Sequence, residues 1–309
     1  MNDKISLIVA TKDRPDDLRK LLESLRCQTV GPAEIVVVDA GREPVEQVVA
    51  GLPELTIRYL RHWPPSAAAQ RNAGIRACSP TATLIGFADD DTTFEPQAFK
   101  NMLDFWQSAE SNVLGACFNI SNYPVRGNGF VKRSRLAERL GLYSARPGSV
   151  SLSGWQTVTG ELAETQFVDW LPSGAVLFRR EVFIHNGFDE FFESYSYLED
   201  LDFSYTISQM GRLAVVANAG FSHFPSSAGR VCARQFGCYE VRNRLYFVRK
   251  HHLSLGRCYL GLAIRLAMSL YSGLADRNSS LLRRAMGNIE ELMRNGPTPW
   301  TKVSPVLSL

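Results

Sequence analysis

Three consecutive aspartates stand where an apolar segment ends. Asp89, Asp90 and Asp91 precede Thr92 and Glu95, which have the spacing of a capping box at the start of a helix. One aspartate could also cap that helix, but three carboxylates are more than capping requires. Carboxylate oxygens at the end of a strand suit Mg²⁺ or Mn²⁺, which bridges to substrate phosphates. The cluster therefore predicts a metal-bound diphosphate.

A second acidic group lies later in the chain. Glu199, Asp200 and Asp202 fall within four residues at the start of a segment with helical spacing. The helix dipole favours acidic residues in a first turn, which explains any one of them. Three are again more than this explanation needs. We expect Asp202 to be structural and the adjacent pair to have a chemical role.

The first 120 residues contain the elements that must position these groups. Short apolar runs at 5–10, 35–38, 57–60, 84–87 and 113–118 alternate with segments of helical spacing, which is the pattern of β-α-β units. The fold class is therefore α/β, with a mostly parallel Rossmann-like sheet flanked by helices. Such sheets bind ligands at the carboxyl ends of their strands, where Thr11 to Arg14, Asp39 and the aspartate cluster follow apolar runs.

The end of the chain is helical and basic. Three helical segments at 230–250, 255–274 and 281–294 carry apolar stripes. From residue 228 onward there are 13 Lys or Arg against 4 Asp or Glu. Packing of these helices on each other or on the body is one interpretation. The alternative is a peripheral membrane-docking surface whose Arg257, Arg265, Arg283, Arg284 and Arg294 face headgroups.

The composition indicates a cytoplasmic location. The first residues show no pattern of a secretion signal, and the six cysteines form no CxxC pair, so we expect reduced thiols. Arg257 and Arg265 interrupt the most apolar late stretch, and a membrane-spanning helix is therefore not expected. If the basic helices dock to lipid, the protein lies at the inner face of the cytoplasmic membrane.

Several short motifs in a fixed order resemble glycosyltransferase family 2, whose catalytic domain has the GT-A fold. They are Ser6-Leu7-Ile8-Val9-Ala10-Thr11, Val36-Val37-Val38-Asp39, Ala69-Gln70-Arg71-Asn72-Ala73-Gly74, Asp89-Asp90-Asp91, Gly187-Phe188-Asp189-Glu190 and Glu199-Asp200-Leu201-Asp202. The resemblance covers roughly residues 4–250. It implies a GT-A catalytic domain at 1–227, with a nucleotide-sugar-binding half at 1–120 and an acceptor-side half at 121–227. Residues 228–309 form a basic helical extension.

The resemblance also implies roles on the donor side. Thr11 and Asp39 contact the nucleotide base, and Arg71 helps to hold the nucleotide. In the aspartate cluster, Asp91 binds the metal with help from Asp89 or Asp90. From the residues alone, Asp39 could instead be a strand-end turn residue and Arg71 a surface arginine of a helix.

On the catalytic and acceptor side, the resemblance implies that Asp200 is the base that deprotonates the acceptor and that Glu199 orients the acceptor. His223 lies where some relatives have a further metal ligand, although a lone histidine is more often packed in the interior. The segment containing Trp170, Ser173 and Gly174 resembles the acceptor-side wall. Trp170 is then a sugar-stacking platform or, alternatively, a core residue.

The expected activity is a metal-dependent inverting transfer of sugar to a hydroxyl of a glycan or lipid-linked glycan, with Mn²⁺ or Mg²⁺ as cofactor. The donor is a UDP-, dTDP- or GDP-linked sugar, and no nucleic acid partner is expected. A sugar-phosphate nucleotidyltransferase is an alternative, but the glycine-rich loop typical of that class is not found after residues 5–10. A non-catalytic nucleotide-sugar or polysaccharide-binding protein is another, and it would have no use for Asp200 as a base. No GxGxxG or GxxxxGK[ST] motif supports a dehydrogenase or a P-loop enzyme.

Overall fold

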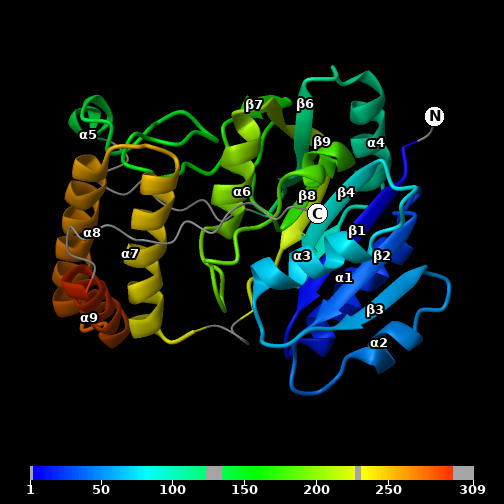
Figure 1. The fold of residues 1–309 in the computed structure, drawn as a ribbon, viewed down its shortest axis with the longest axis horizontal. Helices are drawn as coiled ribbons and strands as arrows, with labels where there is room; N and C mark the ends of the chain where they lie inside the picture. The colour runs from blue at the N-terminus through cyan, green and yellow to red at the C-terminus, as the bar shows by residue number, and fades with distance from the viewer. Residues whose placement is uncertain (1–2, 123–133, 227–230, 295–309) are drawn as a thin grey trace. The chain divides into compact units, whose positions relative to one another are not determined.

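The computed structural model describes residues 3–122, 134–226 and 231–294 and divides into two compact units (Figure 1). The first unit contains residues 3–122 and 158–226, and the second contains residues 134–157 and 231–294. The predicted boundary after residue 227 lies near this division. Residues 134–157, which we predicted to belong to the acceptor-side half, cluster instead with the C-terminal helices.

The first unit is built on one mixed sheet. Its strands are β1 (Ile5–Thr11), β2 (Glu34–Asp39), β3 (Ile57–Arg61), β4 (Leu84–Asp89), β5 (Thr92–Phe94), β6 (Val113–Ile120), β7 (Gln166–Val168), β8 (Ala175–Arg179) and β9 (Arg212–His223). Their order is β3-β2-β1-β4-β8-β6-β9-β5, and β7 pairs with β9. From β3 to β4 the strands are parallel, whereas β8 is antiparallel to both of its neighbours. The chain order reverses between β1 and β4, so the ends of these two strands border the crevice where such sheets bind ligands.

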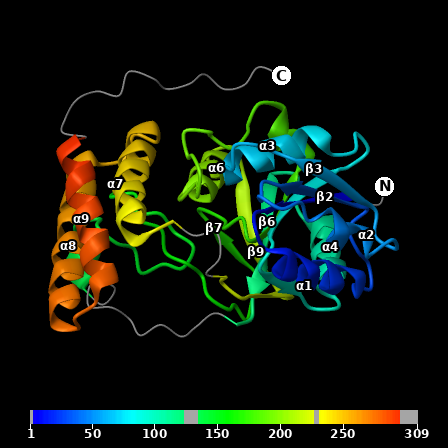
Figure 2. The same ribbon diagram turned by 90° about the horizontal axis from the view of Figure 1, so that it is seen from below.

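Helices cover both faces of this sheet. They are α1 (Pro15–Arg26), α2 (Glu46–Ala50), α3 (Ala67–Ala77), α4 (Ala98–Ser108), α6 (Glu199–Ser208) and the 3₁₀ helix at Arg180–Ile184. Successive side chains of a strand point to opposite faces, so Leu7 and Val9 pack with α1 and α4 while Ile8 packs with α3 and α6. Figure 2 shows α1 below the sheet and α3 and α6 above it. The predicted α/β class and the apolar runs of the first 120 residues are confirmed.

The helix start predicted at Thr92 is wrong. Residues Thr92–Phe94 form β5, which pairs antiparallel with β9, and α4 begins only at Ala98. Phe94 is buried among aromatic rings of the core, and this burial favours an extended segment over a capped helix. The pairing aligns Thr92 with His223. A strand that the sequence pattern missed therefore brings His223 next to the aspartate cluster.

The second unit is helical. It contains α5 (Arg135–Arg139), α7 (Ala233–Lys250), α8 (Leu255–Ala275) and α9 (Ser279–Arg294). The helices α7 and α9 approach closely at Gly237 and Gly287, since a β-carbon on either glycine would lie within about 2 Å of a backbone oxygen of the other helix. The interior of this unit contains a polar cluster among its apolar residues, in which the buried carboxylate of Glu240 accepts hydrogen bonds from Arg284 and Asn288.

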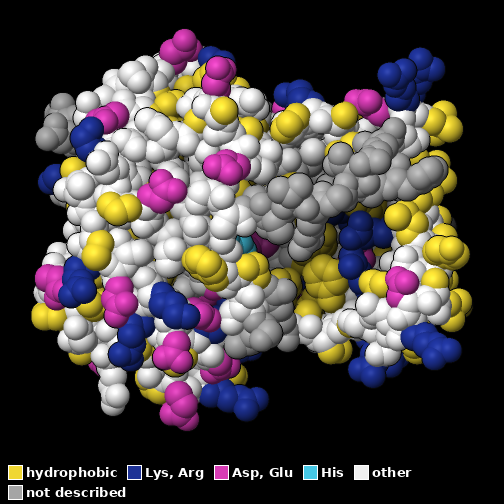
Figure 3. Space-filling view, turned by 180° about the vertical axis from the view of Figure 1, so that it is seen from behind, with side chains coloured by type: hydrophobic (Ala, Val, Ile, Leu, Met, Phe, Trp, Pro, Cys, Tyr) yellow, Lys and Arg dark blue, Asp and Glu magenta, His cyan; other side chains and the backbone are white. Residues whose placement is uncertain are grey.

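Two of the arginines that the docking alternative assigned to lipid headgroups form ion pairs within this unit. Arg265 and Arg284 form ion pairs with the buried Glu240, although the side chain of Arg265 remains 44% exposed and that of Arg284 21%. Helix α8 is also long and apolar enough to cross a membrane by length and composition alone, with a mean hydropathy of 1.3 and 22% of that window buried. Core helices of soluble proteins that have this length and composition are mostly buried. Apolar side chains are visible on the surface among those of Lys and Arg in Figure 3.

Candidate functional site

The carboxyl ends of β1 and β4 lie side by side, with Ala10 opposite Asp89. The turn of Ser173 and Gly174, which precedes β8, packs against the end of β4. The backbone N–H of Asp89 donates to the carbonyl of Gly174 over 3.0 Å. A β-carbon at Gly174 would lie 3.3 Å from Oδ2 of Asp89, tighter than most such contacts, so a larger residue would press on the carboxylate. The Ser173-Gly174 turn and the aspartate cluster, which we predicted separately, are thus neighbours.

Asp89, Asp91 and His223 form a group that could hold a metal ion. One ligand atom from each of the three lies within 4.8 Å of the others. Nε2 of His223 is 3.0 Å from Oδ1 of Asp91, and the backbone N–H of Ser226 donates to Oδ2 of Asp91 over 2.9 Å. The side chains of Asp89 and His223 are each about one-third exposed, so an ion can reach them. Two carboxylates and an imidazole suit Mn²⁺ or Mg²⁺, and imidazole favours Mn²⁺ of the two.

Asp90 points away from this group. Its Oδ2 accepts from the hydroxyl of Thr11 at 2.7 Å, and its Oδ1 accepts from Nη1 of Arg14 at 2.9 Å. The same Nη1 lies 3.5 Å from Oδ2 of Asp91. Asp90 and Thr11 are both buried. Their side chains therefore bind each other and Arg14 in this structure, and their predicted contacts with the nucleotide stay predictions.

Arg71 joins the two acidic groups. It lies on α3, next to Gln70, whose side-chain amide donates to the carbonyls of Thr11 and Val38 and so ties the helix to β1 and β2. Nη1 of Arg71 donates to Glu199 at 2.6 Å and Nη2 donates to Asp89 at 3.1 Å. The guanidinium is buried and bonded in two directions, which gives it a fixed orientation. Arg71 thus links the predicted metal site to the predicted catalytic pair.

Asp200 lies one residue beyond Glu199, in the first turn of α6. Its Oδ1 accepts from the backbone N–H of Leu201 at 2.7 Å, and the backbone N–H of Ser173 also donates to its carboxylate. Leu198, which precedes α6, has a φ of 78°, in the left-handed region that few residues other than glycine adopt. A non-glycine residue held there is strained, and such strain is found mostly at functional sites.

Burial sets the acidity of these groups. It raises the pKa of Glu199 to about 8, although the adjacent Arg71 guanidinium opposes the change. It also raises the pKa of Asp200, where the N–H groups of Leu201 and Ser173 oppose it. Burial likewise raises the pKa of Asp91, but the hydrogen bonds from His223 and Ser226 outweigh it and hold that pKa below its ordinary value. A lowered pKa keeps a carboxylate ionised, as a metal ligand requires, and a raised pKa suits a general base. The directions of these shifts therefore agree with the roles predicted for Asp91 and Asp200.

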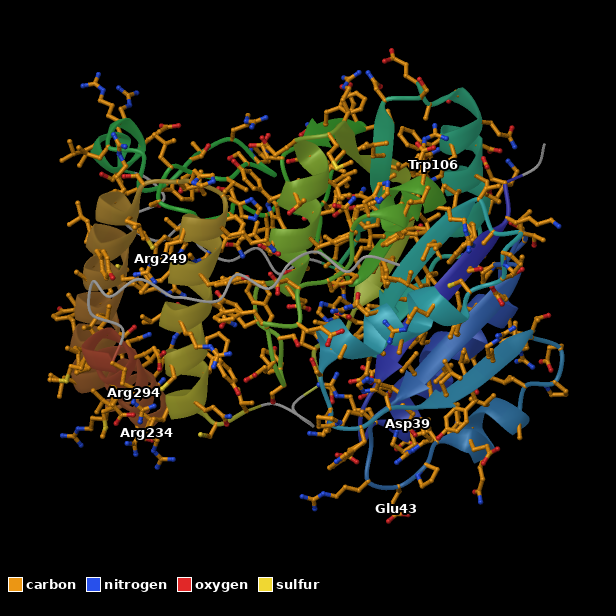
Figure 4. The ribbon with its side chains drawn as sticks, in the orientation of Figure 1. Asp39, Glu43, Trp106, Arg234, Arg249 and Arg294 are labelled. Atoms are coloured by element: carbon orange, nitrogen blue, oxygen red, sulfur yellow. The ribbon has the colours of Figure 1, made fainter. Side chains whose placement is uncertain are left out.

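Asp39 lies at the end of β2 (Figure 4) and is buried. Its carboxylate accepts from the N–H groups of Gly41 and Val45, from the hydroxyl of Tyr59 at 2.7 Å and from Nη1 of Arg61 at 2.6 Å. Burial raises the pKa of Asp39, but these donors together bring it below its usual range. A nucleobase would have to share or replace one of these partners, so base recognition by Asp39 stays a prediction.

Trp170 is buried, with 5% of its surface exposed, and lies just before the Ser173-Gly174 turn. The exposed fraction is small for a sugar-stacking platform, whose face must meet the ligand. Ser173 is buried as well. The acceptor-binding role of these residues stays a prediction.

Sequence reasoning gave no specific role to two arginines of this site, although Arg14 falls in the stretch 11–14 that it marked at the end of the first strand. Arg14 lies three residues after β1 and contacts the aspartate cluster, and Arg61 ends β3 and binds Asp39. Arg61 had a usable signal, because Asp39 and Arg61 both end parallel strands and pair in register. Arg14 had only its place near the end of the first strand. Its contact with Asp90 joins residues 76 positions apart and depends on the fold.

Comparisons with known sequences agree with the resemblance seen in the motifs. The model of a family described as "Glycosyl transferase family 2" matches residues 6–184. The uncharacterized glycosyltransferase YwdF of Bacillus subtilis is 35% identical over 129 residues, which cover 40% of this chain and 47% of YwdF. The galactofuranosyltransferase GlfT1 of Mycobacterium tuberculosis is 34% identical over 103 residues, covering 29% and 31%. These matches span less than half of each curated relative.

Solved structures share the fold at low sequence identity. Residues 1–349 of S. aureus TarS in complex with UDP match with a TM-score of 0.51 and 14% identity, covering 95% of this chain and 92% of that one. The mannosyltransferase PcManGT from Pyrobaculum calidifontis, solved with GDP-Man and Mn²⁺, matches with a TM-score of 0.54 and 13% identity, covering 96% and 88%. The GT-A architecture, a central sheet flanked by helices, is therefore confirmed for this chain.

Proposed function

Because the chain belongs to glycosyl transferase family 2, we propose that it moves a sugar from a nucleotide-sugar to a hydroxyl of a glycan or lipid-linked glycan, with inversion. The observation that carries this proposal is the meeting of two acidic groups around Arg71, one suited to a metal and one suited to proton transfer. Membership of this family does not favour a nucleotidyltransferase. A purely binding protein would not need the second group.

We assign Mn²⁺ or Mg²⁺ to Asp89, Asp91 and His223. The donor atoms fit, since they are two carboxylate oxygens and an imidazole nitrogen near the end of β4. The ion would neutralise the leaving diphosphate. Asp91 contributes an ionised carboxylate, because its pKa lies below the ordinary value. Mn²⁺ accompanies the donor in the PcManGT structure, which has the same fold.

Asp200 is the general base in this proposal. Glu199 is bonded to Arg71 and is therefore the less suitable of the pair, since a base must be able to accept the acceptor proton. Hydrogen bonds from the backbone of Leu201 and Ser173 hold the Asp200 carboxylate, and burial raises its pKa. Attack by the deprotonated hydroxyl opposite the diphosphate is a single displacement, which inverts the anomeric carbon.

The donor is a UDP-, dTDP- or GDP-linked sugar. Structures of the same fold hold UDP in TarS and GDP-Man in PcManGT, so this architecture accepts both a pyrimidine and a purine. In our proposal Asp39 recognises the base together with Thr11. Trp170, Ser173 and Gly174 line the acceptor side, next to Asp200.

We place the protein at the inner face of the cytoplasmic membrane through its second unit. Large apolar side chains of α8 and α9 are exposed: Leu260, Met268, Tyr271, Leu274, Met286, Ile289 and Met293. Arg277, Arg283 and Arg294 are exposed in the same unit, and Figure 4 labels Arg294 at the end of α9. Exposed apolar side chains and exposed arginines in the same helical unit suit a leaflet rich in anionic lipid, where a lipid-linked acceptor would be found.

The substitution Asp200→Asn tests the catalytic assignment. The amide keeps the shape of the side chain but cannot take the proton, so kcat should fall by about 10²-fold or more while donor affinity stays unchanged. Transfer from UDP-, dTDP- and GDP-sugars would be followed with a glycan acceptor, and the product's anomeric configuration would be read by NMR. Asp104→Asn, an exposed aspartate on α4, is the matched control.

Two results would contradict this assignment. Near-normal turnover by Asp200→Asn would move the base elsewhere, with Glu199 the first residue to test. A product with retained configuration would exclude single displacement altogether.

A further inference from the structure

Arg61 is the exposed member of a row of three residues at the carboxyl edge of the sheet. Thr11, Asp39 and Arg61 end β1, β2 and β3 and pair in register, so their side chains lie on the same face of the sheet. Thr11 and Asp39 are buried, with 2% and 0% exposure, whereas 40% of the Arg61 side chain is exposed. A ligand that approaches this row therefore meets Arg61 first.

The neighbours of Arg61 hold its guanidinium in one orientation. Nη1 donates to Oδ2 of Asp39 over 2.6 Å, and Nη2 donates to the carbonyl of Gly41. The loops after β1 and β2 pack closely around that carbonyl, since a β-carbon at Gly41 would lie 2.9 Å from the backbone nitrogen of Asp13. The backbone N–H of Arg42 also donates to Oδ1 of Asp13 over 2.7 Å. The guanidinium is therefore oriented before a ligand arrives, which lowers the entropic cost of binding.

The guanidinium keeps donors for a ligand. It has five N–H groups in a planar fork. In the described part of the chain its partners are Asp39, the carbonyl of Gly41 and the hydroxyl of Tyr59. At least two N–H groups thus remain, on a side chain that solvent reaches. An arginine has no acceptor, so the ligand atom that it binds must itself be an acceptor.

The bases of the proposed donors share an acceptor that such a fork can bind. Uracil and thymine carry carbonyl oxygens beside their ring N–H, and guanine carries O6 beside its own. A base whose ring N–H approaches Asp39 brings the adjacent carbonyl oxygen near Arg61, because the guanidinium is bonded to that carboxylate. The two side chains together then offer an acceptor and a donor to neighbouring atoms of one base.

We propose that Arg61 is a specificity-determining residue of the donor site, which donates a hydrogen bond to the carbonyl oxygen beside the ring N–H of uracil, thymine or guanine. This inference rests on the proposed function, in which Asp39 recognises the base. Removing the donor in Arg61→Met should weaken binding of UDP and of GDP by about 10-fold or more, the expected loss for a hydrogen bond from a charged group. Inorganic pyrophosphate has no base, so its affinity should not change.

The experiment is isothermal titration calorimetry of the full chain with UDP, GDP and inorganic pyrophosphate, each in the presence of Mn²⁺. Arg61→Lys keeps a cation beside Asp39 but has no fork, so it should bind UDP more tightly than Arg61→Met and more weakly than wild type. Tyr59→Phe removes another donor from Oδ2 of Asp39 and leaves Arg61 in place, so its UDP affinity should fall less than that of Arg61→Met. Arg58→Met removes an exposed charge of the same strand and should behave as wild type.

The outcomes separate this inference from the proposed function. UDP affinity that is unchanged in Arg61→Met, or fully restored in Arg61→Lys, would reduce Arg61 to a counter-charge for Asp39 and overturn its role at the base. A loss in Tyr59→Phe as large as that in Arg61→Met, or equal losses of UDP and pyrophosphate, would overturn that role too, because either result indicates a distorted site. In all these cases wild type still binds nucleotide, and the donor site stands. Wild type that binds neither UDP nor GDP with Mn²⁺ would overturn the proposed donor site itself.

Discussion

Replacing Arg71 with methionine should destabilise the fold in a way that depends on pH. Arg71→Met keeps most of the apolar volume and removes the cation shared by Glu199 and Asp89. With a pKa of about 8, Glu199 is mostly protonated at pH 7, so at this pH the substitution removes a hydrogen bond from a charged donor, which is worth about 1.5–3 kcal/mol. The Asp89 side of the bridge is more than a third exposed and contributes about 0–1 kcal/mol. We therefore expect a loss of about 2 kcal/mol in the free energy of unfolding at pH 7, mostly from the hydrogen bond to Glu199.

The sign of the pH dependence follows from the pKa of Glu199. Burial raises this pKa to about 8 in the folded wild type, above the pKa of Glu199 in the unfolded chain. The free energy of unfolding therefore falls as pH rises from the unfolded pKa to about 8. Above pH 8 Glu199 has no further effect on it. Without Arg71 the folded pKa is higher still. The variant should then keep losing stability above pH 8, and the difference from wild type should grow by up to about 1.4 kcal/mol per pH unit.

Urea denaturation at pH 6, 7, 8 and 9 measures this difference. Arg71→Met combined with Glu199→Gln should lose the added pH dependence, because no buried carboxylate is left to ionise. Arg76→Met, an exposed arginine on the same helix, serves as the control. A stability difference that is constant from pH 6 to 9, or one that Glu199→Gln does not flatten, would refute the reasoning.

Three further predictions concern the metal, the helix packing and the lipid surface. Donor-induced thermal stabilisation should vanish in excess chelator and in Asp91→Ala, and tight metal-free donor binding would remove the metal assignment. Gly287→Ala should lower the free energy of unfolding, measured in urea, by about 2 kcal/mol or more, because the new β-carbon would lie 1.9 Å from a backbone oxygen of α7. In the control Gly256→Ala the new β-carbon meets nothing within 4 Å, so this variant should be as stable as wild type. Sedimentation with anionic liposomes should exceed that with neutral ones and fall in the double variant Tyr271→Ser/Leu274→Ser, and equal binding to both lipids would contradict a docked surface.

Local patterns in the sequence were enough for most of the framework. Apolar runs such as 5–10 and 84–87 became β1 and β4 because a strand buried on both faces needs an unbroken apolar segment. Leu18, Leu21 and Leu25 recur at helical spacing, which places them on one face of α1, and that face is buried. The acidic residues themselves were also visible, since a polar cluster directly after an apolar run marks a strand end.

Only the tertiary structure decided which partner each of these carboxylates has. Thr92–Phe94 carry the local signals of a helix start, yet they form β5 because Phe94 fills the core and β9 offers a pairing edge. That pairing brings His223 to Asp91, and packing of α3 on β1 and β2 brings Arg71 between Asp89 and Glu199. These partners are separated by many residues along the chain. Local periodicity reports the burial of one segment, whereas the contacts between charges depend on how all the segments pack together.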